Sequence, residues 1–211
     1  MNFGADEAGK GPVLGSMFVA AVRADPAKLP DGVGDSKSIA PARRKELSAA
    51  IREQAAATEV VEIPVDRIDD PETDMNGLTV AGHASAVAAV AEPGAAGYVD
   101  AGDTNAVRFE RRVSKRVDCE LDLRAEHGAD EQYTVVGAAS ILAKVAREHH
   151  VDQLAADYGE IGSGYPSDPA TRSFLEAFVE EHDRLPACAR DSWQTSQDVL
   201  NAVDQSSLSD F

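Results

Sequence analysis

Apolar and polar positions in the first third of the chain predict three strands. Residues 2–6 form a short apolar run, and residues 13–23 form a longer one after a glycine-rich turn at 9–11. Residues 58–65 (TEVVEIPV) alternate apolar and polar side chains, which is typical of a half-buried strand. Between the second and third strands we expect a loop at 31–38 and an amphipathic helix that starts at Pro41, with Leu47 and Ile51 facing the core.

The rest of the chain predicts helices that alternate with strands. An alanine-rich helix over 75–92 ends at Pro93-Gly94, and a short buried strand over 97–102 follows it. Next come a basic helix over 104–117, a strand from 122, a long helix over 138–159, a helix from 171 and a polar tail. Three consecutive strands followed by this alternation predict an α/β fold in which helices pack against a mixed sheet.

Composition narrows the class of protein. A chain of 211 residues suits one domain with a full core and leaves room for a helical extension. Cys119 and Cys188 lack CxxC spacing, so we expect reduced thiols, and five histidines without a paired motif make a zinc site unexpected. No leader precedes Asp6, and no apolar run approaches the ~20 residues that span a bilayer. We therefore expect a soluble, cytoplasmic monomer with no membrane contact.

The charge balance has two interpretations. Acidic residues outnumber basic ones by 37 to 20, which gives a formal net charge of −17 and should repel phosphate backbones in dilute salt. The protein is either an acidic module that binds protein partners or an enzyme from a salt-rich cytoplasm, where the Debye length falls to about 3 Å at 1 M salt. The acidic runs at 66–74 and 180–183 have the composition of solvated surface, so we favour a halophilic enzyme.

The stretch GADEAGKG at 4–11 fits the spacing of a phosphate-binding P-loop, but its chemistry does not. Gly11 replaces the hydroxyl residue that would hold magnesium, and an apolar strand follows where a helix should start. Asp6 and Glu7 would also repel a phosphate from the cradle. An adjacent Asp and Glu between two strands are either metal ligands or an acidic turn.

Further carboxylates at predicted strand ends are compatible with a metal site. Asp100 lies where the apolar run of the strand over 97–102 stops, and Asp130 follows the strand from 122. Magnesium prefers hard oxygen ligands, and two such ions about 4 Å apart can activate water and stabilise a leaving oxygen in phosphodiester cleavage. The residues alone leave Asp100 open as a strand-end cap and Asp130 as a turn residue, with Glu131 as a competing ligand.

Five blocks between residues 3 and 193 carry a resemblance to a known family. They are DEAGKGPVLG at 6–15, DSK at 35–37, YVDAGD at 98–103, ADEQYTVVGAASILAKVARE at 129–148 and YGEIGSGYPSDPATRSF at 158–174. Together and in this order they resemble the type 2 ribonucleases H in their archaeal form. The resemblance implies a ribonuclease H-like fold, with a five-stranded mixed sheet flanked by helices and a C-terminal helical extension.

The resemblance also implies an activity and a catalytic site. The expected enzyme is an endoribonuclease that cleaves the RNA strand of RNA–DNA hybrids and incises 5′ of ribonucleotides embedded in duplex DNA. Two divalent ions, Mg²⁺ or Mn²⁺, are implied, with 5′-phosphate and 3′-hydroxyl ends as products. The family's catalytic carboxylates match Asp6, Glu7, Asp100 and Asp130.

Substrate contacts follow from the same match. The turn Gly9-Lys10-Gly11 is expected to read the ribose 2′-hydroxyl through its backbone, because glycine allows a close approach. Lys10 departs from the arginine that is usual there, and Thr134 and Gly137 replace residues that are more often Pro and Ser. Further contacts are expected from Lys37, Ser140, Lys144 and Tyr165. The basic helix (Arg108, Arg111, Arg112, Lys115, Arg116) could grip nucleic acid, although we favour pairing with surface acids.

The chain end suggests a partner. Gln205, Leu208 and Phe211 resemble the peptide that docks on the replication sliding clamp, although the usual second aromatic residue is missing. The alternative is a disordered polar tail. We expect a catalytic domain over 1–157, a helical extension over 158–200 and a flexible tail over 201–211.

Two other functions compete with this interpretation. A non-catalytic acidic binding protein would not need carboxylates at all four matched positions. Another nuclease or integrase of ribonuclease H-like fold would lack the GKG turn together with Tyr165.

Overall fold

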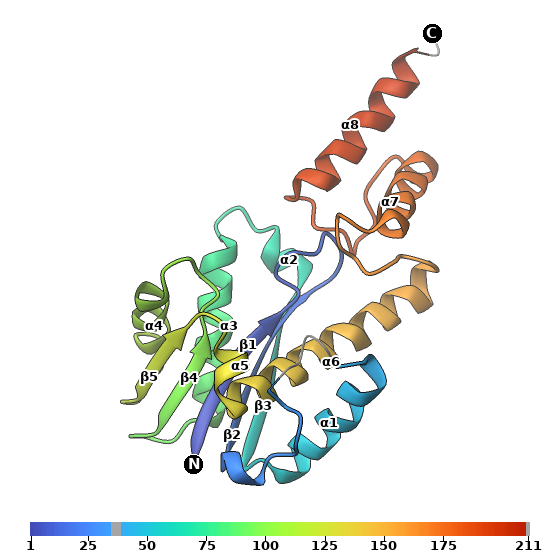
Figure 1. The fold of residues 1–211 in the computed structure, drawn as a ribbon. Helices are drawn as coiled ribbons and strands as arrows, with labels where there is room; N and C mark the ends of the chain where they lie inside the picture. The colour runs from blue at the N-terminus through green and yellow to red at the C-terminus, as the bar shows by residue number, and fades with distance from the viewer. Residues whose placement is uncertain (35–38, 210–211) are drawn as a thin grey trace. The chain divides into compact units, whose positions relative to one another are not determined.

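The fold is built on a five-stranded mixed sheet. The structure is a computed structural model that describes residues 1–34 and 39–209, without the side chains of 204–209. The strands are β1 (Asn2–Ala8), β2 (Met17–Ala24), β3 (Ala57–Ile63), β4 (Ala96–Asp100) and β5 (Asp122–Glu126), in the order β3-β2-β1-β4-β5 (Figure 1). β2 pairs antiparallel with both β1 and β3, while β4 pairs parallel with both β1 and β5. The expected α/β fold with a mixed sheet is confirmed.

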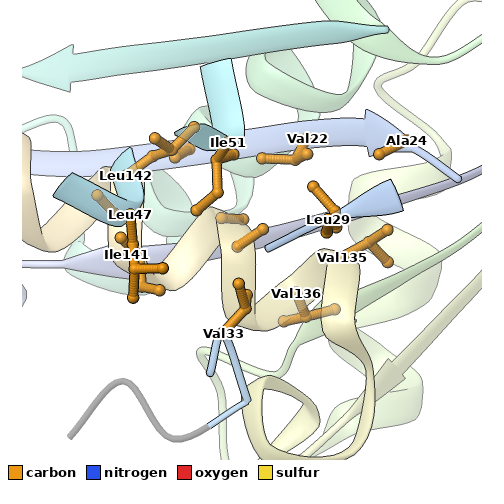
Figure 2. Packing of buried hydrophobic residues seen from close by; sticks show 14 of the residues in the cluster. Val22, Ala24, Leu29, Val33, Leu47, Ile51, Val135, Val136, Ile141 and Leu142 are labelled. Carbon is orange, nitrogen blue, oxygen red and sulfur yellow. The ribbon is translucent and has the colours of Figure 1, made fainter. Parts of the chain in front are cut away.

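Helices cover both faces of this sheet. α3 (Met75–Val90) packs on β1–β3, and a Cβ atom on its Gly82 would lie 2.7 Å from Val19 Cγ2. α4 (Ala106–Ser114) packs on β5. On the opposite face, Ala20 and Val22 of β2 share a core with α1 (Pro41–Gln54) and the first part of α6 (Thr134–Tyr158) (Figure 2). Alternation along β2 thus directs neighbouring side chains to two helical layers.

The core between α1, α6 and the sheet positions the later site. Leu47 and Ile51 face inward as expected, at 2% and 0% exposure. Several small residues let α6 lie close to the strands; a Cβ atom on Gly4 of β1 would come within 2.6 Å of the Val135 carbonyl carbon. The helix therefore meets β1 backbone to backbone, beside Asp6.

The second strand and the long helix start at different residues from those expected. β2 begins at Met17, because the amides of Val13 and Leu14 donate to the Gly164 carbonyl instead of to a neighbouring strand. α6 begins at Thr134, four residues before the expected start. Three short helices were not expected: η1 (Pro26–Lys28), α2 (Val65–Ile68) and α5 (Ala129–Gln132).

Packing divides the chain into two compact units. The first contains Met1–Lys10, Met17–Ile63 and Asp74–Arg147, and the second contains Gly11–Ser16, Pro64–Thr73 and Glu148–Phe211. These bounds differ from the expected domains at 1–157 and 158–200, because the second unit includes part of α6 and two earlier segments. The domain limits taken from the sequence stay a prediction.

The second unit has its own apolar core. α7 (Pro169–His182) and α8 (Gln194–Ser209) pack together, with Val13, Leu14, Ile161 and Leu175 buried. Arg190 is fully buried in this unit and its Nε donates to the Gly15 carbonyl at 2.9 Å.

Helix α8 continues into the segment beyond residue 200. Residues 201–209 are its last residues, and the flexible tail over 201–211 stays a prediction. No described helix is long and apolar enough to cross a membrane. Both cysteines are free, and burial raises the pKa of the Cys188 thiol to about 11.

Candidate active site

Asp6 and Glu7 lie near the end of β1 and point to opposite faces of the sheet. The strand register pairs Asp6 with Ala20 and Glu7 with Val19. Because neighbouring strand residues alternate, Asp6 faces α6 and Glu7 faces α3. Asp6 is 6% exposed, accepts a hydrogen bond from Ser140 of α6, and accepts the Glu7 amide at 2.7 Å through Oδ1.

Asp100 and Asp130 come from β4 and α5. Asp100 ends its strand, as expected, and its Oδ1 accepts the Ala129 amide at 2.8 Å. Asp130 is buried in the short helix α5, which follows Gly128 in the left-handed conformation (φ 69°). The bond from Ala129 ties this helix to the end of β4, so the two carboxylates are held on adjoining elements.

The four carboxylates share one electrostatic neighbourhood. Burial raises the pKa of Asp6 well above its usual value, and the charges of Glu7 and Asp100 raise it further. Burial likewise raises the pKa of Asp100, with contributions from Glu7 and Asp130. Groups brought together in this way from β1, β4 and α5 favour a bound cation over four separate negative charges.

Stacked tyrosines support the carboxyl end of β5 and the helix that carries Asp130. Tyr133, directly after α5, stacks on Tyr98 of β4 with ring centroids 3.7 Å apart. Its hydroxyl donates to Glu126 Oε1 at 2.8 Å. α5 is therefore fixed at both ends, by the Ala129 amide and by this ring.

Sequence reasoning missed His83, which contacts Glu7 directly. His83 of α3 is fully buried, and its Nε2 lies 2.8 Å from Glu7 Oε2. Its ring meets Phe109 edge-on, with centroids 5.0 Å apart. The available signal was a single histidine within an apolar, alanine-rich helix, where a buried imidazole needs a polar partner.

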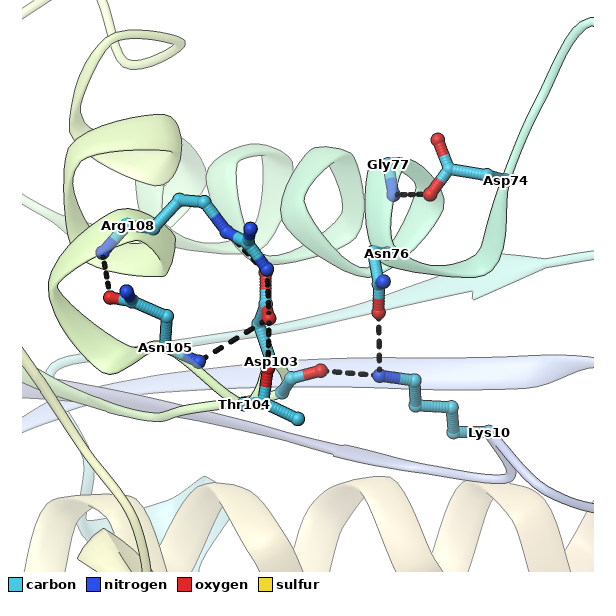
Figure 3. A network of polar contacts seen from close by, with 9 residues as sticks. Lys10, Asp74, Asn76, Gly77, Asp103, Thr104, Asn105 and Arg108 are labelled. Atoms are coloured by element: carbon cyan, nitrogen blue, oxygen red, sulfur yellow. Dashed lines mark hydrogen bonds and ion pairs between the residues drawn. The ribbon is translucent and has the colours of Figure 1, made fainter.

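An open pocket of about 480 Å³ adjoins Glu7, and Figure 3 shows its polar contacts. Lys10 Nζ donates to the Gly102 carbonyl and lies 3.3 Å from Asn76 Oδ1. Arg108 Nη2 lies 2.6 Å from Asp103 Oδ1, and this arginine lowers the pKa of Asp103 to about 2. His127 also lines the pocket. Arg108 of the basic helix thus pairs with an acidic group, but Asp103 is buried and is not one of the surface acids that we expected.

The glycine turn is divided between the two compact units. Gly9, with φ 91°, and Lys10 belong to the first unit, whereas Gly11 belongs to the second. Within the second unit, a Cβ atom on Gly11 would lie 3.8 Å from the Tyr165 ring, which is 46% exposed. Trp193 Nε1 donates to the Gly11 carbonyl at 3.3 Å. Gly11 and Tyr165 therefore lie side by side, with the ring accessible.

The remaining expected substrate residues differ in their surroundings. Ser140 is fully buried; it donates to Asp6 and accepts a hydrogen bond from Lys144 Nζ at 3.0 Å. Lys37 lies outside the described residues. Gln205 and Leu208 fall on the backbone of α8, but their side chains and the whole of Phe211 also lie outside that description.

The donor chemistry suits a divalent cation, although the ligands are not yet converged. Carboxylate oxygens are the ligands that Mg²⁺ and Mn²⁺ prefer. Among the described residues, no three His, Cys, Asp or Glu side chains form a ready-made metal site. Asp6 Oδ1 accepts the Glu7 amide and Asp100 Oδ1 accepts the Ala129 amide, so these two carboxylates would bind a cation through their other oxygens or after a rotation of the side chain.

Comparison with known proteins gives a consistent family. A family model described as Ribonuclease HII matches residues 3–196. Ribonuclease HII of Haloarcula marismortui is 64% identical over the full length of both chains. The crystal structure of ribonuclease H2 from Pyrococcus horikoshii OT3 has a TM-score of 0.90 at 32% identity, covering 96% of this chain and 98% of that one. The PCNA:RNase HII complex from Archaeoglobus fulgidus gives 0.85 at 36% identity, covering 94% and 96%.

Proposed function

Because the chain belongs to the ribonuclease HII family, endonucleases that hydrolyse the RNA of RNA–DNA hybrids, we propose that it also incises duplex DNA 5′ of an embedded ribonucleotide, with divalent ions held by its four clustered carboxylates. The products would carry 5′-phosphate and 3′-hydroxyl ends. The protein would act as a cytoplasmic monomer.

The crowding of acidic groups is the observation that carries this proposal. Besides burial, the charges of Glu7 and Asp100 raise the pKa of Asp6, and those of Glu7 and Asp130 raise the pKa of Asp100. A cation bound among these groups would offset that repulsion. Two Mg²⁺ or Mn²⁺ ions, when bound, would activate water and stabilise the leaving oxygen. The four carboxylates that we propose as ligands are Asp6, Glu7, Asp100 and Asp130.

Neighbouring residues hold this set in place. Ser140 donates to Asp6 while accepting Lys144 Nζ, so it orients the carboxylate from inside the fold. We assign Ser140 this positioning role in place of direct substrate contact, because its side chain is fully buried. Lys144 and Lys37 remain the proposed contacts to backbone phosphates.

Recognition of the ribose would fall to the turn and the tyrosine. The exposed Tyr165 ring beside Gly11 offers an apolar face, and the glycine leaves room for a sugar to approach the backbone. Gly9 and Lys10 would complete the turn that reads the 2′-hydroxyl, the group that separates RNA from DNA.

A duplex that contains a single ribonucleotide tests the proposal. We expect Mn²⁺- or Mg²⁺-dependent incision 5′ of the ribonucleotide in concentrated KCl. Asp6→Asn should lower the rate by on the order of a hundredfold or more, whereas the exposed control Asp122→Asn should keep it. Cleavage of hybrids without incision at the single ribonucleotide would contradict the proposed substrate. Incision that survives in Asp6→Asn would contradict the proposed ligands.

A second proposal concerns a partner. A related ribonuclease HII was solved in complex with PCNA, and the end of this chain carries Gln205, Leu208 and Phe211 at the spacing of a clamp-binding peptide. We expect archaeal PCNA to bind the full chain, and a chain that ends at residue 204 to lose that binding while keeping nuclease activity. Equal affinity of both chains for PCNA would contradict the proposal that residues 205–211 bind the clamp.

A further inference from the structure

The contact between His83 and Glu7 joins a catalytic strand to the helix that covers it. His83 is fully buried, and the only hydrogen bond of its ring within the described residues runs from Nε2 to Glu7 Oε2 at 2.8 Å. Nδ1 is buried with no hydrogen-bond partner among those residues. Within the described residues, the imidazole therefore makes a single hydrogen bond, to one oxygen of Glu7.

The chemistry of the two partners fixes the direction of this bond. An ionised carboxylate can only accept, so the ring carries its proton on Nε2 and donates it to Oε2. Oε1, the other oxygen of Glu7, accepts no hydrogen bond within the part of the chain that the structure describes. Glu7 also lines the open pocket. One oxygen is thus held by the protein, and the other is left for a ligand.

The sequence around His83 explains how the ring reaches the strand. A Cβ atom on the preceding residue, Gly82, would lie 2.7 Å from Val19 Cγ2 and 2.9 Å from Ile63 Cδ1. Without that Cβ, α3 settles close to the sheet, and the next side chain extends beside β1. Phe109 of α4 meets the imidazole edge-on and limits its rotation.

The remaining walls around Glu7 restrict its carboxylate further. A Cβ atom on Gly102 would lie 2.6 Å from Thr79 Cγ2 and 3.0 Å from Glu7 Oε1. The Glu7 side chain is only 12% exposed. A carboxylate in so narrow a space has few orientations, and a single donor is enough to select one.

We propose that His83 is a positioning residue that orients Glu7 for metal binding by donating Nε2–H to Oε2, so that Oε1 would remain available to a bound ion. This inference rests on the proposed role of Glu7 as a ligand. Hydrogen bonds to ligating carboxylates fix their orientation, and their loss typically lowers metal affinity by about 10–100-fold.

A matched pair of substitutions separates positioning from packing. His83→Gln places an amide N–H near the position of Nε2, whereas His83→Asn places it near Nδ1, which contacts no acceptor. Both variants place a neutral amide at this buried position, so they differ mainly in where the N–H group lies. The primary readout is Mn²⁺ affinity, measured by calorimetry without nucleic acid, and thermal unfolding in concentrated KCl checks the fold.

We expect His83→Gln to bind Mn²⁺ within about threefold of the native protein, and His83→Asn to bind about 10–100-fold more weakly with a cooperative unfolding transition. Single-turnover rates at saturating Mn²⁺ should recover in part for His83→Asn, because the fault is in ligand orientation. Equal Mn²⁺ affinity for all three proteins would overturn the inference. So would equal weakening in both variants, which would mean that N–H donation does not restore the site.

Glu7→Gln distinguishes this failure from failure of the proposed function. If Glu7→Gln binds Mn²⁺ as the native protein does, Glu7 is not a ligand and the proposed site itself is wrong. If Glu7→Gln loses affinity while His83→Asn keeps it, the site stands and only the role of His83 is refuted.

Discussion

Lys10 connects the turn after β1 to the rim of the pocket beside Glu7. Its Nζ donates to the Gly102 carbonyl and contacts Asn76, at a position where the family resemblance leads us to expect arginine (Figure 3). The ammonium group is therefore occupied within the protein. Its chemical role in this conformation is to tether the turn and not to present a planar fork to substrate.

Two substitutions of Lys10 test whether its role is the hydrogen bonds that tether the turn or the ammonium group itself. Lys10→Met removes a charged hydrogen bond, and we expect kcat/KM on a single-ribonucleotide duplex to fall about tenfold. Lys10→Arg can reach the same acceptors and should stay within about threefold. Steady-state kinetics in concentrated KCl measure both. An Arg variant as impaired as the Met variant would show that the ammonium itself is needed.

Residues of the site differ in how far the sequence predicts them. Asp6, Glu7 and Asp100 follow from motif blocks and from strand ends, and the structure brings them into one electrostatic neighbourhood. His83 and the buried position of Ser140 do not follow, because they depend on which helix covers which face of β1. Only the packing of α3 on one face of the sheet and of α6 on the other supplies that information.

At the scale of elements, the approach of α6 to β1 leaves no room for a side chain on Gly4. A Cβ atom there would lie 2.5–2.8 Å from backbone atoms of Val135 and Val136, which cannot rotate away. We expect Gly4→Ala to lower the free energy of unfolding by about 1–3 kcal/mol, seen as a lower melting temperature, and to reduce activity, because α6 carries Ser140.

Gly34→Ala is the control for this prediction. A Cβ atom at Gly34 meets no described atom within 4 Å, so its melting temperature should stay close to that of the native protein. A Gly4→Ala variant as stable as Gly34→Ala would mean that α6 shifts freely on the sheet.

The loop between β4 and α4 depends on a charged pair that acid should break. Hydrogen bonds from Arg108 lower the pKa of Asp103 to about 2, below the value of about 3.9 in an unfolded chain. The stabilisation is therefore complete above the unfolded value and is lost as pH falls toward 2. Asp103→Asn resembles the protonated side chain. We expect it to melt below the native protein at pH 7, with a gap that is clearly smaller at pH 2.5.

Arg43→Gln gives a comparison for that measurement. Arg43 pairs with Glu46 at 2.8 Å, but both side chains are mostly exposed, so its loss should hardly change the melting temperature at any pH. A constant gap between Asp103→Asn and the native protein from pH 7 to pH 2.5 would contradict the assigned cause.

Element boundaries show where local pattern stops being sufficient. The apolar run over 13–23 predicts one strand, yet Val13 and Leu14 donate to Gly164 and join the second unit, so β2 starts at Met17. Those residues are apolar for a different core, which no local periodicity can distinguish. The strand over 58–65 and the helix from Pro41 were predictable because their partners are close in sequence: β3 pairs with β2, and α1 packs in the core that β2 shares.

At the scale of the whole molecule, the formal charge of −17 opposes both compaction and approach to nucleic acid. The resemblance to a ribonuclease HII of the salt-adapted archaeon Haloarcula marismortui is consistent with the halophilic interpretation of the sequence. Carboxylates at the site add to this repulsion locally: besides burial, neighbouring carboxylate charges raise the pKa values of Asp6 and Asp100. Mobile cations in the solvent would reduce the global part, and ions bound at the site would reduce the local part.

Melting temperatures measured against salt concentration should distinguish the repulsion across the surface from the repulsion at the site. Raising KCl from 0.1 to 1 M shortens the Debye length from about 10 Å to about 3 Å, so self-repulsion across the surface is largely screened by 1 M. We expect the melting temperature to rise steeply over that range and then to flatten. Sucrose at matched osmotic strength, which acts through exclusion from the surface, should give a smaller and unsaturated rise. Adding Mn²⁺ at 2 M KCl should raise the melting temperature of the native protein further but leave Asp6→Asn nearly unchanged, because only the site carboxylates remain unscreened. A melting temperature that sucrose raises as much as KCl would show that surface charge does not limit the stability of this protein.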